Sequence, residues 1–195
     1  MFKRLDTWFG GQKHGERSAL ILATVLILTG APVSAQPTLE NTVKAAYLSK
    51  LAAFVDWPPT SFENPASPLR ICVIGDDPFK STLDRAVSGL SVAGRPVQVA
   101  RYGAVEAGMG CQVAFVAGSP TQSRADALKA LQGQPVLTVT DQPGAQGAEG
   151  GGEQGIVSFV VRDSRVRFAI DQRAAVEDHL SLSGKLLSLA LEVRR

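Results

Sequence analysis

Histidine and cysteine, on which many catalytic and metal sites depend, are scarce in this sequence. Its 195 residues include two histidines and two cysteines, and one histidine, His14, lies in the first segment of the chain. The other, His179, has Asp178 as its neighbour, but the chain contains no Gly-x-Ser-x-Gly elbow and no Cys-x-x-Cys pair for zinc. A hydrolase that uses His179 and Ser181 is therefore the least favoured hypothesis, and we predict a non-enzymatic protein without a metal or cofactor.

A long hydrophobic run is also missing. The apolar stretch Ala19–Leu28 has about ten residues, well below the roughly 20 that span a bilayer as a helix. Small residues at Val33-Ser34-Ala35 follow it, no cysteine lies nearby for a lipid anchor, and four basic residues precede it: Lys3, Arg4, Lys13 and Arg17. This is the pattern of a secretory signal peptide. We predict cleavage after Ala35, with residues 36–195 forming the mature periplasmic protein; an uncleaved membrane anchor is the alternative.

Net charge disappears once this segment is removed. The chain has 20 Lys and Arg against 18 Asp and Glu, but four of the basic and two of the acidic residues precede Gln36. The mature part is left with 16 of each sign. Because binding to nucleic acid normally requires a basic face, we do not expect a nucleic-acid partner.

Apolar patterns after Gln36 predict alternating helices and strands. Residues 43–57 have apolar side chains at helical spacing and end before Pro58-Pro59, which stop a helix. Strands are predicted at 69–74, 97–101, 111–117 and 136–140, and helices from Asp76 or Asp77 to about Leu90 and over 122–131. This order is typical of a single-domain α/β sandwich with a mainly parallel sheet.

The last third of the chain is predicted to add a hairpin and a helix to this domain. Asp163-Ser164 separates two apolar strands, 156–162 and 165–170, in the manner of a two-residue turn. A C-terminal helix is predicted over 184–193. Before the hairpin, residues 143–155 include six glycines, and we expect them to form a flexible loop within the domain.

The two cysteines are predicted to lie at the same end of neighbouring strands. Cys72 lies early in the strand 69–74 and Cys111 begins the strand 111–117, so parallel pairing of these strands would bring the two Cα atoms within bonding range. An even cysteine count in an exported protein favours a disulfide, and two buried free thiols are the alternative. Closing a loop of about 40 residues would stabilise the fold by about 4 kcal/mol in the chain-entropy model.

Paired acids follow the first predicted strand. Asp76 and Asp77 stand where an open parallel sheet usually binds ligands, and paired carboxylates there are compatible with a magnesium site. Their expected role as caps of the following helix already explains them, and we prefer that interpretation.

Six segments, in their order and spacing, carry a family resemblance. They are VKAAYLSKLAAFVDWPP (43–59), LRICVIGDDPF (69–79), GRP (94–96), VLTVTD (136–141), VRFAI (166–170) and LSGKLL (182–187). Together they resemble the YfiR family of periplasmic regulators. The resemblance implies a protein that binds the sensor domain of an inner-membrane diguanylate cyclase and inhibits it, and so controls cyclic di-GMP.

The resemblance also implies further partners and sites. An OmpA-type outer-membrane lipoprotein would sequester the regulator, and the family's cysteine pair falls on Cys72 and Cys111. A second pair that some members have after the fourth strand is missing here, so redox switching through that loop is not implied. A ligand pocket would fall near Asp171, Ser181 and Ser183. The alternative function is a small periplasmic solute-binding protein that feeds a sensor kinase or transporter; the sequence does not fix the oligomeric state, and a homodimer stays open.

The partner surface is expected on the hairpin. Both strands are rich in apolar residues, so we predict that Phe159 and Phe168 are exposed contact residues, together with the glycine-rich loop and the last helix; a position of Phe159 in the core is the alternative. Trp57 is a further candidate, with packing against the core as an equal alternative. Arg165 and Arg167 alternate with apolar residues on an expected edge strand, where we favour a role in preventing strand pairing over ligand binding.

Overall fold

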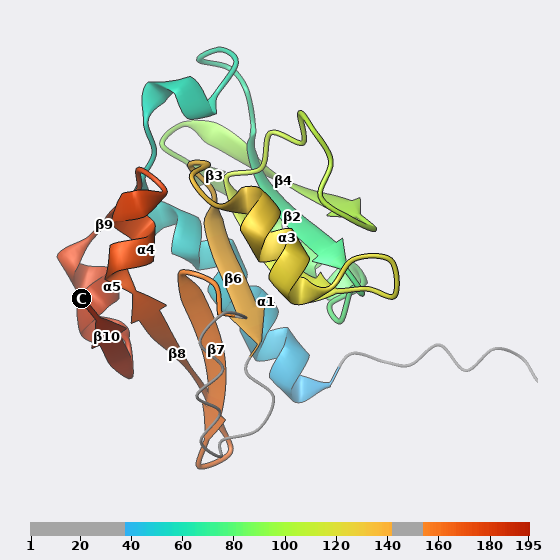
Figure 1. Ribbon diagram of the computed structural model, residues 1–195, viewed down its shortest axis with the longest axis vertical. Helices are drawn as coiled ribbons and strands as arrows, with labels where there is room; N and C mark the ends of the chain where they lie inside the picture. Colours follow the sequence, from blue (N-terminus) through green and yellow to red (C-terminus); the bar gives the residue numbers. More distant parts are fainter. Residues whose placement is uncertain (1–37, 142–153) are drawn as a thin grey trace, which may run out of the picture. The chain divides into compact units, whose positions relative to one another are not determined.

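The sheet at the centre of the domain is mainly parallel (Figure 1). The computed structural model describes residues 38–141 and 154–195, and the glycine-rich segment expected to be a flexible loop lies largely outside them. Within the described residues, eight strands follow the order β10-β8-β7-β6-β5-β2-β4-β3. The neighbours from β4 to β7 are all parallel, while β3 and β8 pair antiparallel at either side. The predicted α/β class with a mainly parallel sheet is confirmed.

The elements have the following bounds. The helices are α1 (Leu39–Leu51), α2 (Ser81–Val87), α3 (Arg124–Leu131), α4 (Gln172–Glu177) and α5 (Gly184–Leu189), with single 3-10 turns at Ala52–Phe54 and Pro59–Ser61. The sheet contains β2 (Leu69–Gly75), β3 (Ser91–Val92), β4 (Arg95–Tyr102), β5 (Val113–Gly118), β6 (Leu137–Asp141), β7 (Val157–Arg162), β8 (Arg165–Asp171) and β10 (Glu192–Arg194). A separate two-stranded pairing joins β1 (Val55–Asp56) to β9 (Ser181–Leu182).

Helices cover both faces of the sheet, which explains why strands such as β2 and β5 are almost entirely apolar. Along β2, Ile71 and Val73 face the larger core, which α1 and α2 close. Cys72 and Ile74 face a smaller core, to which α3 contributes Ala127 and Leu131. Figure 1 shows α1 and α3 on opposite sides of the strands. Because a strand buried on both faces has no polar side to display, β2 reads as an almost continuous apolar run.

Three predicted helices have different ends in the structure. The first begins at Leu39, where the Thr38 side chain accepts a hydrogen bond from the Asn41 N–H (3.2 Å), and it ends at Leu51, because Val55–Asp56 pairs with β9 instead. The second begins at Ser81, not directly at Asp76 or Asp77. The predicted C-terminal helix is shorter than expected: α5 ends at Leu189, because Glu192–Arg194 forms a strand that pairs with β8.

The hairpin matches its prediction. Asp163 and Ser164 have φ values of +52° and +57°, as both residues of a type I′ turn must. Phe159 pairs with Phe168 across β7 and β8. On its other side, β8 is paired with β10 only through Ala169–Asp171.

Candidate functional site: a groove beside the hairpin

An open groove lies between the N-terminal half of α1 and the β7–β8 hairpin. Its volume is about 680 Å³. The helix contributes Leu39, Val43 and Tyr47, and the hairpin contributes Val161 and Val166. The remaining lining residues are polar or charged: Glu40, Ser164, Arg165 and Arg167. The groove is therefore an apolar trough with basic side chains along its hairpin edge.

The groove exposes large aliphatic side chains. Leu39 is 81% exposed and Val43 is 36% exposed. Since full burial of one aliphatic side chain stabilises by about 1.5–3 kcal/mol, a partner that covered both residues would gain a substantial part of its binding free energy there. An exposed apolar patch of this kind, with a charged margin, is typical of a protein interaction site.

A buried ion pair fixes α1 beside the hairpin. The Lys44 side chain is buried and its ammonium group lies 2.7 Å from the carboxylate of Asp141, at the end of β6. Lys44 also contacts Glu40, one turn earlier on the same helix. Because a buried charge is costly without its partners, these contacts favour one position for the first two turns of α1. They thereby position Leu39 and Val43.

Phe159 and Phe168 lie under the groove and not on its surface. Phe159 is fully buried and Phe168 is 3% exposed. The Tyr47 ring covers both, with ring centroids 6.0 Å from Phe159 and 5.7 Å from Phe168. The expectation that these two residues are exposed contact residues is therefore wrong. The apolar face of the hairpin is covered by α1. A partner could therefore contact the groove residues but not the two phenylalanines beneath them.

The predicted disulfide is present. Cys72 and Cys111 are bonded, with their Cα atoms 5.8 Å apart and 39 positions apart in the sequence. β2 and β5 are parallel neighbours, as the pairing required. Both cysteines are buried in the smaller core, which α3 covers. This position indicates a structural bond that is not open to solvent.

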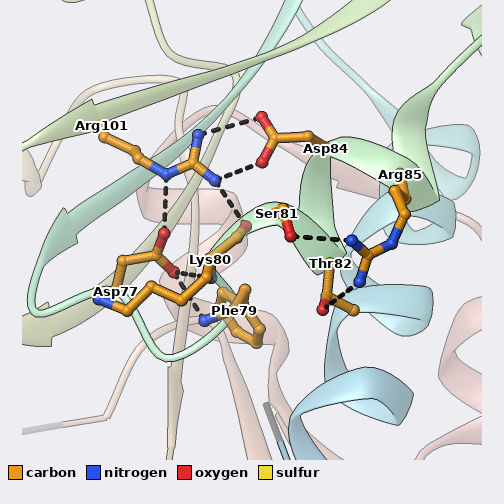
Figure 2. A network of polar contacts seen from close by, with 8 residues as sticks. All are labelled: Asp77, Phe79, Lys80, Ser81, Thr82, Asp84, Arg85 and Arg101. Atoms are coloured by element: carbon orange, nitrogen blue, oxygen red, sulfur yellow. Dashed lines mark hydrogen bonds and ion pairs between the residues drawn. The ribbon is translucent and has the colours of Figure 1, made fainter. Parts of the chain in front are cut away.

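Asp77 binds an arginine and caps a turn (Figure 2). Its Oδ1 accepts hydrogen bonds from the N–H groups of Phe79 (2.7 Å) and Lys80 (3.1 Å), and its Oδ2 lies 2.7 Å from Arg101 Nε. Arg101 also donates to Asp84 (2.6 Å), and this hydrogen bond lowers the pKa of the Asp84 carboxyl. In the described part of the chain, no group of three or more metal-ligating side chains occurs. Asp77 therefore closes the turn before α2, whereas α2 follows Lys80 and has no side-chain cap, so the expectation that this acidic pair caps the helix is wrong.

Three side chains suggested for a ligand pocket have local structural roles. Asp171 caps α4 by accepting the Ala174 N–H (3.0 Å), and Ser183 caps α5 by accepting the Leu186 N–H (3.2 Å). Ser181 pairs with Asp56 between β9 and β1. Asp171 lines a cavity of about 100 Å³, whose lining includes neither serine. The structure does not bring these residues together in one pocket.

Trp57 and His179 lie outside the groove. Trp57 is partly buried and packs against the larger core, which is the packing role left open for it. His179 is exposed and follows α4, with a φ value of +59°. Its neighbour Asp178 is buried, and burial raises the pKa of that carboxyl although Oδ1 accepts the Gly133 N–H at 2.6 Å. Asp178 therefore joins the end of α3 to the end of α4 and does not orient the His179 imidazole.

Most groove residues, among them Leu39, Val43 and Tyr47 of α1, have no functional signal in the sequence. Leu39 was placed before the helix, although Thr38 three positions ahead of Asn41 is a usable helix-start signal. The helical spacing of apolar residues over 43–57 places Tyr47 only on the face of the helix that packs on the core. Its position over the hairpin depends on a contact between segments more than 100 positions apart, which no local pattern reveals.

Comparison with known families gives a match over most of the chain. A family model described as YfiR/HmsC-like (DUF4154) matches residues 41–191, a range that contains most of α1, the hairpin and both cysteines. No curated protein matches the sequence. Among the helices of the described residues, none is long and apolar enough to cross a membrane.

Proposed function

The chain belongs to the YfiR/HmsC-like family, and from this premise we propose that it binds the sensor domain of an inner-membrane diguanylate cyclase and holds the enzyme inactive. The family consists of periplasmic regulators of diguanylate cyclase signalling and not of enzymes. In this proposal, residues 36–195 are exported to the periplasm, and the groove beside the hairpin receives the sensor domain.

The single observation that carries the proposal is the exposed apolar lining of this groove. Leu39 and Val43 sit on a helix that is fixed by the Lys44–Asp141 ion pair, so a partner would meet a preformed surface. Inhibition requires more than binding, because a regulator shifts the cyclase only if it prefers the inactive state. Moving a two-state equilibrium from 1:99 to 99:1 takes about 5.5 kcal/mol of differential binding. Burial of two or three aliphatic side chains in one state only is of this magnitude.

The alternative of a solute-binding protein is less well supported by the cavities. Small-molecule sites usually enclose about 300–1,000 Å³ and bury most of the ligand. The cavity beside Asp171 has about 100 Å³, two cavities of about 290 and 350 Å³ beside Asp178 and Gln112 are open to solvent, and the 680 Å³ groove is open and apolar. A flat or open apolar surface suits a protein partner better than a small polar solute. An OmpA-type outer-membrane lipoprotein would release the cyclase by competing for the same regulator.

The test combines a deletion with one charge substitution. Deleting the gene should raise cyclic di-GMP, and Leu39→Glu should have the same effect, because an unpaired charge in a desolvated interface costs several kcal/mol. Leu39 is 81% exposed, so the variant should fold and melt as the wild type does. Val176→Glu is the matched control, since Val176 is 65% exposed on α4 and does not line the groove.

Two results would contradict the proposal at different points. A folded Leu39→Glu protein that represses normally would remove the groove from the interface. An unchanged cyclic di-GMP level in the deletion strain would overturn the regulatory function itself.

A further inference from the structure

One edge of the hairpin has no strand beside it. β10 pairs with β8 only at Ala169–Asp171, and within the described residues no strand pairs with the outer side of Arg165–Arg167. Figure 1 shows the hairpin end of β8 extending beyond β10. A strand edge of this kind presents backbone donors and acceptors to any extended chain that approaches it.

The backbone contacts show which groups face outward. The Phe168 carbonyl accepts a hydrogen bond from the Leu191 N–H (2.8 Å), so the backbone of Phe168 points away from β7. In an antiparallel pair, residues alternate between facing the partner strand and facing away from it. Val166, two positions earlier, therefore directs its N–H and C=O outward, while Arg165 and Arg167 direct theirs to β7.

The same edge lines the apolar groove. Val166 and both arginines are lining residues, together with Leu39 and Val43 of α1. A strand placed beside β8 would have alternate side chains on its two faces. Side chains on one face of the added strand would lie next to Val166 and contact the apolar groove. Side chains on its other face would lie next to Arg165 and Arg167.

The arginines select among possible occupants. Both are exposed, and neither forms an ion pair with another residue of the described chain. If two copies of β8 paired antiparallel about Val166, Arg165 of one copy would face Arg167 of the other. Like charges directly opposite each other destabilise a strand pair. A second copy is therefore disfavoured, and a strand with acidic residues opposite the arginines is favoured.

We infer that the partner binds by adding an extended segment as a strand along Arg165–Arg167 of β8, with acidic residues opposite the two arginines and apolar residues in the groove. This inference rests on the proposed function, because it states how the same groove receives its partner. The main-chain hydrogen bonds to Val166 would supply affinity, and the arginines with the groove would supply specificity. The sequence favours a role of Arg165 and Arg167 in preventing strand pairing. In this inference they prevent pairing with a second copy of the chain but allow pairing with a strand that carries acidic residues.

The inference can be tested on the purified protein with two peptides. The first is an eight-residue peptide in which valine and glutamate alternate, and the second has lysine in place of glutamate. Amide hydrogen exchange of Val166 and Phe168, followed by NMR, reports strand addition directly. We expect the glutamate peptide to slow exchange of the Val166 amide by about tenfold or more near saturation, and the lysine peptide to leave it unchanged. The double variant Arg165→Glu/Arg167→Glu should reverse this preference.

A pair of substitutions isolates the backbone contribution. Val166→Pro removes the outward N–H, and proline is tolerated on a strand edge where no ladder bond is lost. Val166→Thr keeps the N–H and the branched side chain. Glutamate-peptide binding, measured by fluorescence anisotropy, should weaken by about tenfold in the proline variant and by much less in the threonine variant.

Three outcomes would overturn strand addition. They are an unprotected Val166 amide with the glutamate peptide, equal protection by the lysine peptide, and protection that appears with rising protein concentration alone, which would indicate a second copy. The proposed function is judged separately. If Leu39→Glu abolishes repression while the peptide results fail, the groove still binds the cyclase but in another manner. If the peptide results hold while deletion leaves cyclic di-GMP unchanged, the strand site exists but serves another partner.

Discussion

Removing the disulfide should lower stability strongly without abolishing partner binding. The change is Cys72→Ala/Cys111→Ala, which deletes the cross-link and both sulfur atoms. The bond closes a loop over a sequence separation of 39, for which chain entropy gives about 4 kcal/mol at 25 °C. For a domain of about 160 residues, 1 kcal/mol shifts the melting temperature by about 2–4 °C. The variant should therefore melt about 10–15 °C below the wild type.

The assay is thermal unfolding followed by circular dichroism. The wild type is measured in two forms: untreated, and after its disulfide has been reduced by a thiol under denaturing conditions. The reduced wild type should melt close to the alanine variant, because both lack the cross-link. Below its melting temperature, the variant should still repress the cyclase, since both cysteines lie in the smaller core and not in the groove. A melting temperature within about 2 °C of the wild type would refute the entropic reasoning. Loss of repression by a folded variant would refute the purely structural role.

Two other predictions concern Asp178 and the N-terminus. Because burial raises the pKa of Asp178 above its ordinary value of 3.8, the stability linked to its protonated form is present below that value and is lost as pH rises through the raised pKa. Asp178→Asn keeps an acceptor for the Gly133 N–H, so its free energy of unfolding should rise relative to that of the wild type as pH rises. Urea unfolding at several pH values measures this difference. A difference that does not change with pH would show that the charged carboxylate does not destabilise the fold. The exported protein should begin at Gln36, and a mass that retains residues before Ala35 would contradict signal-peptide cleavage.

The part of the fold that followed from the sequence is the part set by local patterns. β2 and β5 are short apolar runs between turn signals, and Asp163-Ser164 supplies the two residues that a tight hairpin turn needs. The last helix was predicted too long because its apolar residues continue at helical spacing to Leu191. Pairing of Glu192–Arg194 with β8 overrides that pattern, and such pairing depends on a strand more than 20 positions away.

The candidate site shows the same division. Apolarity of both hairpin strands is visible in the sequence, and the groove proposed as the partner site lies beside this hairpin. Whether Phe159 and Phe168 are exposed, however, depends on where α1 packs, and the sequence does not state that Tyr47 covers both rings. Likewise, the position of Asp77 before a helix predicts a helix cap, whereas its side chain closes the preceding turn and contacts Arg101, because β4 lies beside β2. Turns and strands with local signals were therefore predictable; among contacts between distant segments, the Cys72–Cys111 bond was predicted, but the packing of α1 on the hairpin was not.

The positions of the disulfide and the groove bear on how the proposed regulation would be reversed. The cross-link joins β2 to the residues just before β5 within the smaller core, whereas the groove lies at the hairpin, where α1 covers the larger core. Reduction would act mainly on the unfolded state, because a disulfide stabilises chiefly by restricting that state. It would thus change the amount of folded regulator more than the shape of the groove. A competitor for Leu39, Val43 and the β8 edge would act directly on the bound complex, since it removes the free regulator by mass action. For a chain with this single cysteine pair, release by a competing protein therefore fits the proposed function better than release by a redox change.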